Sequence, residues 1–575
     1  MAQEKKINKK RRDLISFVLL LTIIVLINFI SSFYFKRFDL TEEKRYTISA
    51  QTKDMLKHLD DAVYFKIYLD GKLNADNNHL RNATREMLDE FRAYSPNIEY
   101  EFINPSSNPD KKQRESLYKQ LVEKGITPKN QETGMENGVS EQIIFPGSIV
   151  SCKGREMTVQ LLKDQKGLSP EQQINGSIEA LEYELTNVIR KLRMQSKPKI
   201  AFIDGQYELD SLHTVDITAS LFEYYQVERV KIGNNIHALI DTLNKAPSIL
   251  KYKAIIIAKP DSGFSDKAKL LIDQYIMYGG KVLWLVNPVT TNMDSLKRNT
   301  FTFAIPSQLR LEDMLFTYGV RINPNLLMDM QCARIPLNVA YNKGEPKFKF
   351  MPFVFFPLIG PAPNDNNPII KNLDLIEFRF VSSIDTISAK GIKKTVLLRS
   401  SSHTRITNTP TRVSTSVAYM PPDERQFHNF YQPVAVLLEG AFTSVYKDHV
   451  PTAIKQSREF GYRENGVNTK MIVISSGDII ANEISRGQVV PLGYDLYMNQ
   501  LFGNKNFILN CVNYLCDDSG LISVRSREIK LRMMDRKKIK NEESQWKALN
   551  MTVPVALVLL FGLIRYYLRK KKYTS

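Results

Sequence analysis

The stretch FSDKAKLLIDQYIMYGGKVLWLVNP, residues 264–288, carries the strongest local folding signals in the chain. Ser265 precedes an apolar helical pattern and is suited to cap a helix over 266–278. Gly279-Gly280 ends that helix, because glycine readily takes the left-handed backbone of a helix C-terminus. The apolar run KVLWLV at 281–286 follows at once. A helix that turns directly into an apolar strand indicates an α/β domain whose central strands are buried on both faces.

Further strands surround this unit in a module that we place at 197–522, after the helix-breaking Lys197-Pro198. The pattern loosens between about 301 and 393, which predicts an insertion, and the Ser/Thr-rich segment 400–430 predicts an exposed loop. The Phe- and Pro-rich residues 346–363 fit either core strand or a partner-facing patch. The other elements that we expect in this module are strands at 199–203, 254–258, 395–398, 434–438 and 471–475 and a helix at 504–516.

A smaller module is expected at 46–195. Ser49 is suited to cap its first helix, and the strands and helices that follow have the order βαβαββα. This is the thioredoxin-like arrangement. A redox member of that fold would carry C-x-x-C near the end of the first strand, where this chain has LDGKLNADN. The elements expected here are strands at 62–69, 98–103, 142–151 and 156–161 and helices at 77–94, 111–124 and 177–194.

Two apolar runs predict membrane spans. Residues 14–35 contain no ionisable group, and a helix of that length reaches roughly 33 Å, enough for a hydrocarbon core of about 30 Å. The run 548–564 is shorter and contains Pro554, so a buried helix is its alternative. Two spans put the basic tails 1–13 and 565–575 on one side, which the bases before the first span predict to be the cytoplasm. Residues 36–547 then form a periplasmic body anchored in the inner membrane.

Most of the formal net charge of +18 lies in the two tails and in residues 525–540. A basic nucleic-acid-binding face on the body is therefore not expected. The basic juxtamembrane segment, within 523–547, fits either a solvated helix or contact with anionic membrane lipid or an acidic partner.

Motifs for catalysis are absent from the sequence. It contains no G-x-x-x-x-G-K-[ST], no G-x-G-x-x-G after a strand, no H-E-x-x-H and no G-x-S-x-G. We therefore expect no catalytic residue, no metal and no cofactor. Four cysteines in a chain of this size do not describe a disulfide scaffold, and we expect them to be small buried residues.

Two sets of residues remain as candidates for binding. Ligands of open α/β sheets bind at the carboxyl ends of the strands, although polar residues also fill ordinary loops. Within the membrane, small and polar residues favour contact between helices. The candidates at the strand ends are Asp204, Gln206, Glu208, Lys259, Asp261, Asn287 and Asp478, with Ser476 beside the last. The candidates for contact between spans are Thr22, Asn28, Ser31, Ser32, Thr552, Ala556 and Gly562.

Several stretches resemble auxiliary, substrate-binding-like components of ABC transporters associated with gliding motility. The opening signature RFDLTEEKRYTIS at 37–49 is similar to theirs, and so are YGVRINPNLLMDMQCARIPL at 318–337 and GNKNFILNCVNYLCDDSGLI at 503–522. The resemblance covers nearly the whole chain. It implies a membrane-anchored periplasmic subunit that acts with a separate multispan permease and, through it, a cytoplasmic ATPase. It also implies that the larger module is an ABC-auxiliary, intraflagellar-transport-like α/β domain.

Two other classes of function stay open from the sequence. The chain fits a structural periplasmic scaffold of a gliding or secretion apparatus nearly as well. A hydrolase or amidotransferase relative would need a nucleophile on a strand-to-helix turn near a histidine, and the sequence does not supply that pattern.

Overall fold

The structure is a computed structural model, which divides into two compact units, Met1–Glu528 and Ile529–Ser575. Statements about structure below concern its described residues. These are 14–26, 48–135, 138–163, 169–194, 196–233, 235–243, 246–291, 295–296, 299–342, 345–362, 365–371, 373–420, 422–518, 520, 522, 524 and 536–573.

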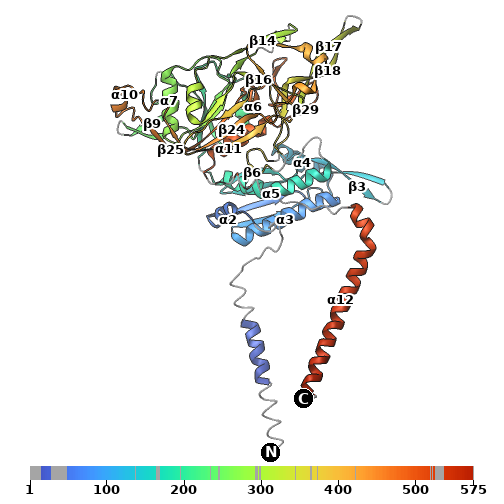
Figure 1. The fold of residues 1–575 in the computed structure, drawn as a ribbon. Helices are drawn as coiled ribbons and strands as arrows, with labels where there is room; N and C mark the ends of the chain where they lie inside the picture. The colour runs from blue at the N-terminus through green and yellow to red at the C-terminus, as the bar shows by residue number, and fades with distance from the viewer. Residues whose placement is uncertain are drawn as a thin grey trace, which may run out of the picture. The chain divides into compact units, whose positions relative to one another are not determined.

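The N-terminal part of the first unit has a four-stranded sheet with the order β2-β1-β5-β6. Its two long helices, α3 and α5, run next to each other (Figure 1). β1 and β2 are parallel, whereas β5 and β6 are antiparallel to their neighbours. Helices α3 and α5 pack on it through a core that includes Phe65, Leu88 and Leu185. The elements are α2 (Ala50–Lys57), β1 (Val63–Ile67), α3 (Ala75–Tyr94), β2 (Ile98–Phe102), α4 (Lys111–Glu123), β3 (Lys129–Met135), β4 (Gly138–Ile144), β5 (Gly147–Cys152), β6 (Arg155–Gln160) and α5 (Pro170–Arg193).

Two boundaries in this part differ from the sequence prediction. The strand expected at 142–151 is two strands, because Pro146 interrupts it and β4 pairs with β3 in a separate hairpin. Helix α5 begins earlier than residue 177, because Ser169 and Gln172 form a capping box and Pro170 occupies the first turn. The Ser49 cap is confirmed, since its side chain accepts a hydrogen bond from the backbone nitrogen of Thr52.

A seven-stranded sheet of order β21-β24-β25-β12-β11-β7-β8 forms the larger part of the unit. Strands β25, β12, β11, β7 and β8 are parallel, β24 is antiparallel to β25, and the edge strand β21 is antiparallel to β24. Their bounds are β7 (Lys199–Asp204), β8 (Gln226–Lys231), β11 (Ala254–Ala258), β12 (Lys281–Leu285), β21 (Ile392–Arg399), β24 (Pro433–Thr443) and β25 (Asn465–Ile474).

Helices cover both faces of this sheet. Ile200 and Phe202 of β7 pack in one core with α6 (Val215–Phe222) and α11 (Asn504–Cys516). Ala201 and Ile203, which point the other way, pack in a second core with α7 (Asp266–Met277) and α9 (Glu312–Tyr318). A sheet with two buried faces explains why its central strands read as apolar runs.

Strand β8 was not predicted from the sequence. Its residues QVERVK carry charges because it is the edge strand, and its side chains are only partly buried. An edge strand lacks the continuous apolar run that identifies the central ones.

The insertion is built mainly from strands. The expected loop at 400–430 is wrong in part, because β22 (Thr404–Asn408) pairs with β16 (Asn325–Asp329) and β23 (Thr411–Ser414) pairs with β14 (Phe301–Pro306). β-Branched residues within the Ser/Thr-rich sequence supply these short strands. The other strands of the insertion are β13 (Val289–Thr290), β15 (Val320–Ile322), β17 (Cys332–Asn342), β18 (Glu345–Ile359), β19 (Ile376–Glu377) and β20 (Ile384–Thr386).

The Phe-rich segment 346–363 is mainly core strand. Phe353, Phe355 and Phe356 of β18 are buried and pack together, while Phe348 and Phe350, nearer the tip of the long β17–β18 hairpin, are exposed.

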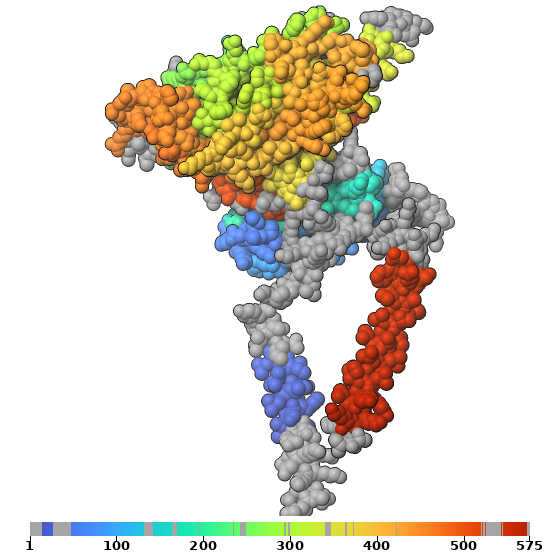
Figure 2. Space-filling view, viewed as in Figure 1, coloured from blue at the N-terminus to red at the C-terminus, as the bar shows by residue number. Residues whose placement is uncertain are grey.

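The segment between β24 and β25, which contains α10 (Thr452–Gln456), lies beside α7 (Figure 2). There the Tyr278 hydroxyl donates to the Gly461 carbonyl at 2.7 Å.

The second unit contains α12 (Arg536–Tyr573). Its segment Ser544–Lys571 is long and apolar enough to cross a membrane, and it includes the whole predicted run 548–564. Of the first predicted span, residues 14–26 form an apolar helix that is shorter than a span, and residues 27–35 lie outside the described part of the chain. The first span therefore stays a prediction.

Candidate functional site

The carboxyl edge of the seven-stranded sheet is the place where this fold offers a ligand site. The chain runs from β7 outward to β8 and then returns to β11 on the other side of β7. The helices near this point lie on opposite faces, α6 on one and α7 on the other. Loops diverge at such a reversal and leave a crevice at the strand ends. The strand-end residues predicted from the sequence all lie at this edge.

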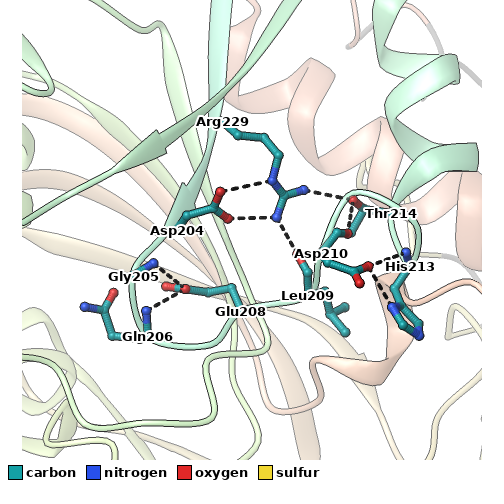
Figure 3. Close-up of polar contacts among 9 residues, drawn as sticks. All are labelled: Asp204, Gly205, Gln206, Glu208, Leu209, Asp210, His213, Thr214 and Arg229. Atoms are coloured by element: carbon teal, nitrogen blue, oxygen red, sulfur yellow. Dashed lines mark hydrogen bonds and ion pairs between the residues drawn. The ribbon is translucent and has the colours of Figure 1, made fainter.

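Asp204, at the end of β7, is bound by an arginine from the edge strand β8 (Figure 3). Arg229 Nη2 lies 2.8 Å from Asp204 Oδ1, and Arg229 Nε lies 3.2 Å from Oδ2. The same guanidinium donates to the Thr214 hydroxyl at 3.1 Å and to the Leu209 carbonyl. The carboxylate of Asp204 is thus neutralised by a fork of hydrogen bonds that also holds the following loop.

The turn after β7 is closed by Glu208. Its Oε2 accepts from the backbone nitrogens of Gly205 at 2.9 Å and Gln206 at 2.7 Å (Figure 3). Its Oε1 and the Oε1 of Gln206 are buried and have no hydrogen-bond partner among the described residues. Burial raises the pKa of the Glu208 carboxyl, because desolvation disfavours the charged form. Tyr207, between them, is 83% exposed and takes a left-handed backbone with φ 55°.

Hydrogen bonds join the loops after β7 and β11 across the crevice. The Gln206 carbonyl accepts from the backbone nitrogens of Asp261 at 2.9 Å and Ser262 at 3.1 Å, and the Leu209 nitrogen donates to the Ala258 carbonyl at 3.0 Å. The side chain of Asp261 is exposed. Backbone pairing therefore occupies the space between these loops.

Lys259, Asn287 and Asp478 form a second polar cluster, from the loops after β11, β12 and β25. Lys259 Nζ lies 2.5 Å from Asp478 Oδ1, and Asn287 Nδ2 donates to Asp478 Oδ2 at 2.7 Å. Asn287 also accepts from the backbone nitrogen of Gly477. Gly477 is needed there, because a Cβ at this position would lie 2.4 Å from the Cβ of Lys259. Ser476 beside it is buried, and its hydroxyl donates to the Arg379 carbonyl at 3.3 Å.

The predicted residues thus form two clusters. Asp204 and Glu208 hold the turn after β7 through Arg229 and backbone nitrogens, and Lys259 and Asn287 both bind Asp478. The sequence analysis missed Arg229, because the strand that carries it was not recognised. Within the described ranges, no group of three or more His, Cys, Asp or Glu side chains is placed to hold a metal ion. The arrangement ties loops together, and it does not pair a nucleophile with a general base.

A cavity of about 530 Å³ lies at the same edge, beside Asn287. Val286 and Pro288, on either side of Asn287, line it, and its other walls come from α9, β15 and the loop before α9. Its lining residues all fall within 286–324. The sequence analysis did not predict that they lie close together, because the pattern of helices and strands becomes irregular in this part of the chain. Only the apolar residues of an otherwise polar loop, Leu309 and Leu311, hinted at a buried surface there.

The candidate residues for membrane contacts fall on two helices. Thr22 and Thr552 each donate their hydroxyl to the carbonyl four residues earlier, at 2.8 Å. Ala556 and Gly562 lie in α12, and a Cβ built at Gly562 would meet no atom within 4 Å beyond its chain neighbours and the nearby backbone of its own helix. Asn28, Ser31 and Ser32 lie outside the described residues.

Comparison with protein-family models identifies the class of protein. The family described as "ABC-type uncharacterized transport system", an auxiliary domain of ABC transporters, matches residues 197–511, which is more than half of the chain. The chain belongs to this family. A domain of unknown function, DUF7088, matches residues 42–151.

Individual relatives are distant. A curated protein of Borreliella burgdorferi, described as an uncharacterized protein, is 20% identical over 570 residues, which is 98% of this chain and 99% of that protein. A solved structure titled "mmIFT52 N-terminal domain" covers 55% of this chain and 96% of its own, with 13% identity and a TM-score of 0.30.

Proposed function

We propose that this protein is a non-catalytic, membrane-anchored auxiliary subunit of an ABC-type transport system. One observation carries the proposal: the ABC auxiliary domain at 197–511 shares a chain with Ser544–Lys571, a helix suited to cross a membrane. Membership of the family supports an accessory role beside permease and ATPase components.

Energy for transport would come from another chain. The sequence contains no P-loop, so ATP hydrolysis by that route is left to a separate ATPase. The polar residues at the carboxyl edge of the sheet mainly hold loops together, which favours a binding or coupling role over catalysis.

Coupling to that ATPase would run through a multispan permease. We infer that two spans pack against the permease through Thr22, Asn28, Ser31 and Ser32 in the first and Thr552, Ala556 and Gly562 in or beside the second. The basic juxtamembrane segment would meet anionic lipid head groups.

The finer assignment rests on the sequence resemblance. We propose a component of the GldG type, associated with gliding motility, whose periplasmic body consists of a thioredoxin-like module at 46–195 and the ABC-auxiliary module at 197–522. The strand order β2-β1-β5-β6 supports this division, and so does the fact that each module has a hydrophobic core of its own.

Purification from the native membrane in mild detergent tests the proposal. The permease should copurify with this protein, and the ATPase should copurify only when the permease is present. Gly562→Leu should lower permease recovery, whereas Phe561→Leu, at the neighbouring position of α12, should not. Capture of the ATPase from cells that lack the permease would contradict coupling through the permease. Recovery of neither protein would favour a structural scaffold instead.

A further inference from the structure

The cavity beside Asn287 has buried leucine side chains in its lining. Leu309, Leu311 and Leu315 line it, and each is at most 3% exposed. Its volume of about 530 Å³ lies within the roughly 300–1,000 Å³ that small-molecule sites occupy. Phe316 is 51% exposed and lines it too, so an aromatic ring stands where an entering molecule would contact it. An apolar body of limited size fits this lining.

The charged residues of the lining differ in what they already bind. Both oxygens of Asp313 accept from Lys269 Nζ, at 2.6 and 2.7 Å, and Lys269 is buried. Glu312 is exposed and lies in the first turn of α9, where the helix N-terminus favours a negative charge. Asp313 is therefore already paired within the protein, whereas Glu312 is exposed to solvent.

Arg321 has no ion pair among the described residues. It lies on β15, directly across from Asp385 on β20, but Asp385 Oδ2 accepts from Asn323 Nδ2 at 3.0 Å instead. The guanidinium of Arg321 is exposed to solvent and is free to bind an anion at the mouth of the cavity. A carboxylate is the group that a guanidinium binds best, because it can accept two parallel hydrogen bonds.

We propose that this cavity binds a molecule with an apolar body and a carboxylate, held by Arg321. The apolar part would lie against the leucines, and the carboxylate would remain near the mouth. The position at the carboxyl edge of the sheet, beside Val286 and Asn287, is the one that α/β folds use for ligands. This site is independent of the role in transport: a protein that fails to bind a permease could still bind this ligand.

A matched series of leucine derivatives tests the proposal on the full-length protein in lipid nanodiscs. N-acetyl-L-leucine carries only the carboxylate, N-acetyl-L-leucinamide is neutral, and L-leucinamide carries only an ammonium group. Saturation-transfer NMR should rank the carboxylate first, at least tenfold tighter than the other two. Two further compounds distinguish the source of the carboxylate. Tighter binding of 4-methylpentanoate would indicate a free acid, and tighter binding of the peptide Ala-Ala-Leu would indicate a peptide C-terminus.

Two variants locate the binding. Arg321→Gln should weaken N-acetyl-L-leucine at least tenfold and leave the neutral amide unchanged. Ile322→Trp should fill the cavity and weaken all three compounds, whereas Ile305→Trp, at an exposed position of β14 outside the lining, should not. Thermal unfolding of each variant confirms folding. Equal binding of the carboxylate and the amide, or tightest binding of leucinamide, would overturn the role of Arg321. Unchanged binding in a folded Ile322→Trp variant would overturn the site itself.

Discussion

The carboxyl group of Glu208 is held in a position that disfavours its charge. Burial raises the pKa of this carboxyl above the pKa of a glutamate in an unfolded chain, which is about 4.3. The folded state therefore binds the proton more tightly. The resulting stabilisation is complete below the unfolded pKa and is lost as the pH rises through the higher folded pKa.

Replacement by glutamine should remove this dependence. In Glu208→Gln one oxygen still accepts from Gly205 and Gln206, and no buried charge forms at neutral pH. The variant should gain about 1 kcal/mol in free energy of unfolding at pH 7, the order of one unsatisfied buried polar group. The gain should vanish below about pH 3, where the wild-type carboxyl is protonated in both states. Urea unfolding over that pH range measures it, and a gain that is equal at all pH values would contradict the titration of Glu208.

At the scale of elements, one buried carboxylate on α7 joins this helix to α9 and to the segment after β24. Asp273 accepts from the Ser444 hydroxyl at 2.7 Å, the Tyr318 hydroxyl at 2.9 Å, Gln274 Nε2 at 2.9 Å and the Val445 backbone nitrogen at 3.0 Å. These donors come from α7, α9 and the segment after β24. One side chain therefore joins three elements that the sequence separates by up to 172 residues.

Loss of this carboxylate should destabilise the fold strongly. Asp273→Ala leaves buried donors without an acceptor and should lower the free energy of unfolding by about 3 kcal/mol. Asp266→Ala is the matched control on the same helix, because Asp266 is exposed and its ion pair with Arg310 should contribute less than about 1 kcal/mol. Chemical denaturation of both variants makes the comparison. Equal losses would mean that the buried network contributes no more than a surface ion pair.

The elements that could be predicted are those whose signal is local. The cap at Ser265, the helix α7 and the apolar strand β12 are each specified by adjacent residues, and the structure has them within one residue of the predicted bounds. Strands β8, β22 and β23 escaped prediction, because edge strands and short strands of an insertion depend on distant partners. The same holds for the candidate site. The polar residues at the strand ends could be predicted once the strands were recognised, but the cavity could not, because its walls come from loops that only the fold brings into contact.

For the whole molecule, the orientation in the membrane depends on charge at the ends of the spans. Bases are more numerous in residues 1–13 than at 36–45 after the first apolar run, which predicts a cytoplasmic N-terminus. The basic residues 525–540, before the second run, favour the opposite orientation. We base the predicted orientation on the charges around the first span, because long translocated regions contribute little to orientation.

A reporter at the C-terminus should resolve this conflict. The segment Ser544–Lys571 would extend roughly 42 Å as a helix, more than the hydrocarbon core of about 30 Å, so it can return the chain to the cytoplasm. A protein that fluoresces only in the cytoplasm should be bright when fused after Ser575. The same reporter fused after residue 522, in a chain that ends before the second run, should be dark although the fusion is stable. A dark and stable fusion at Ser575 would mean that α12 does not span, and a bright fusion at 522 would place the body in the cytoplasm.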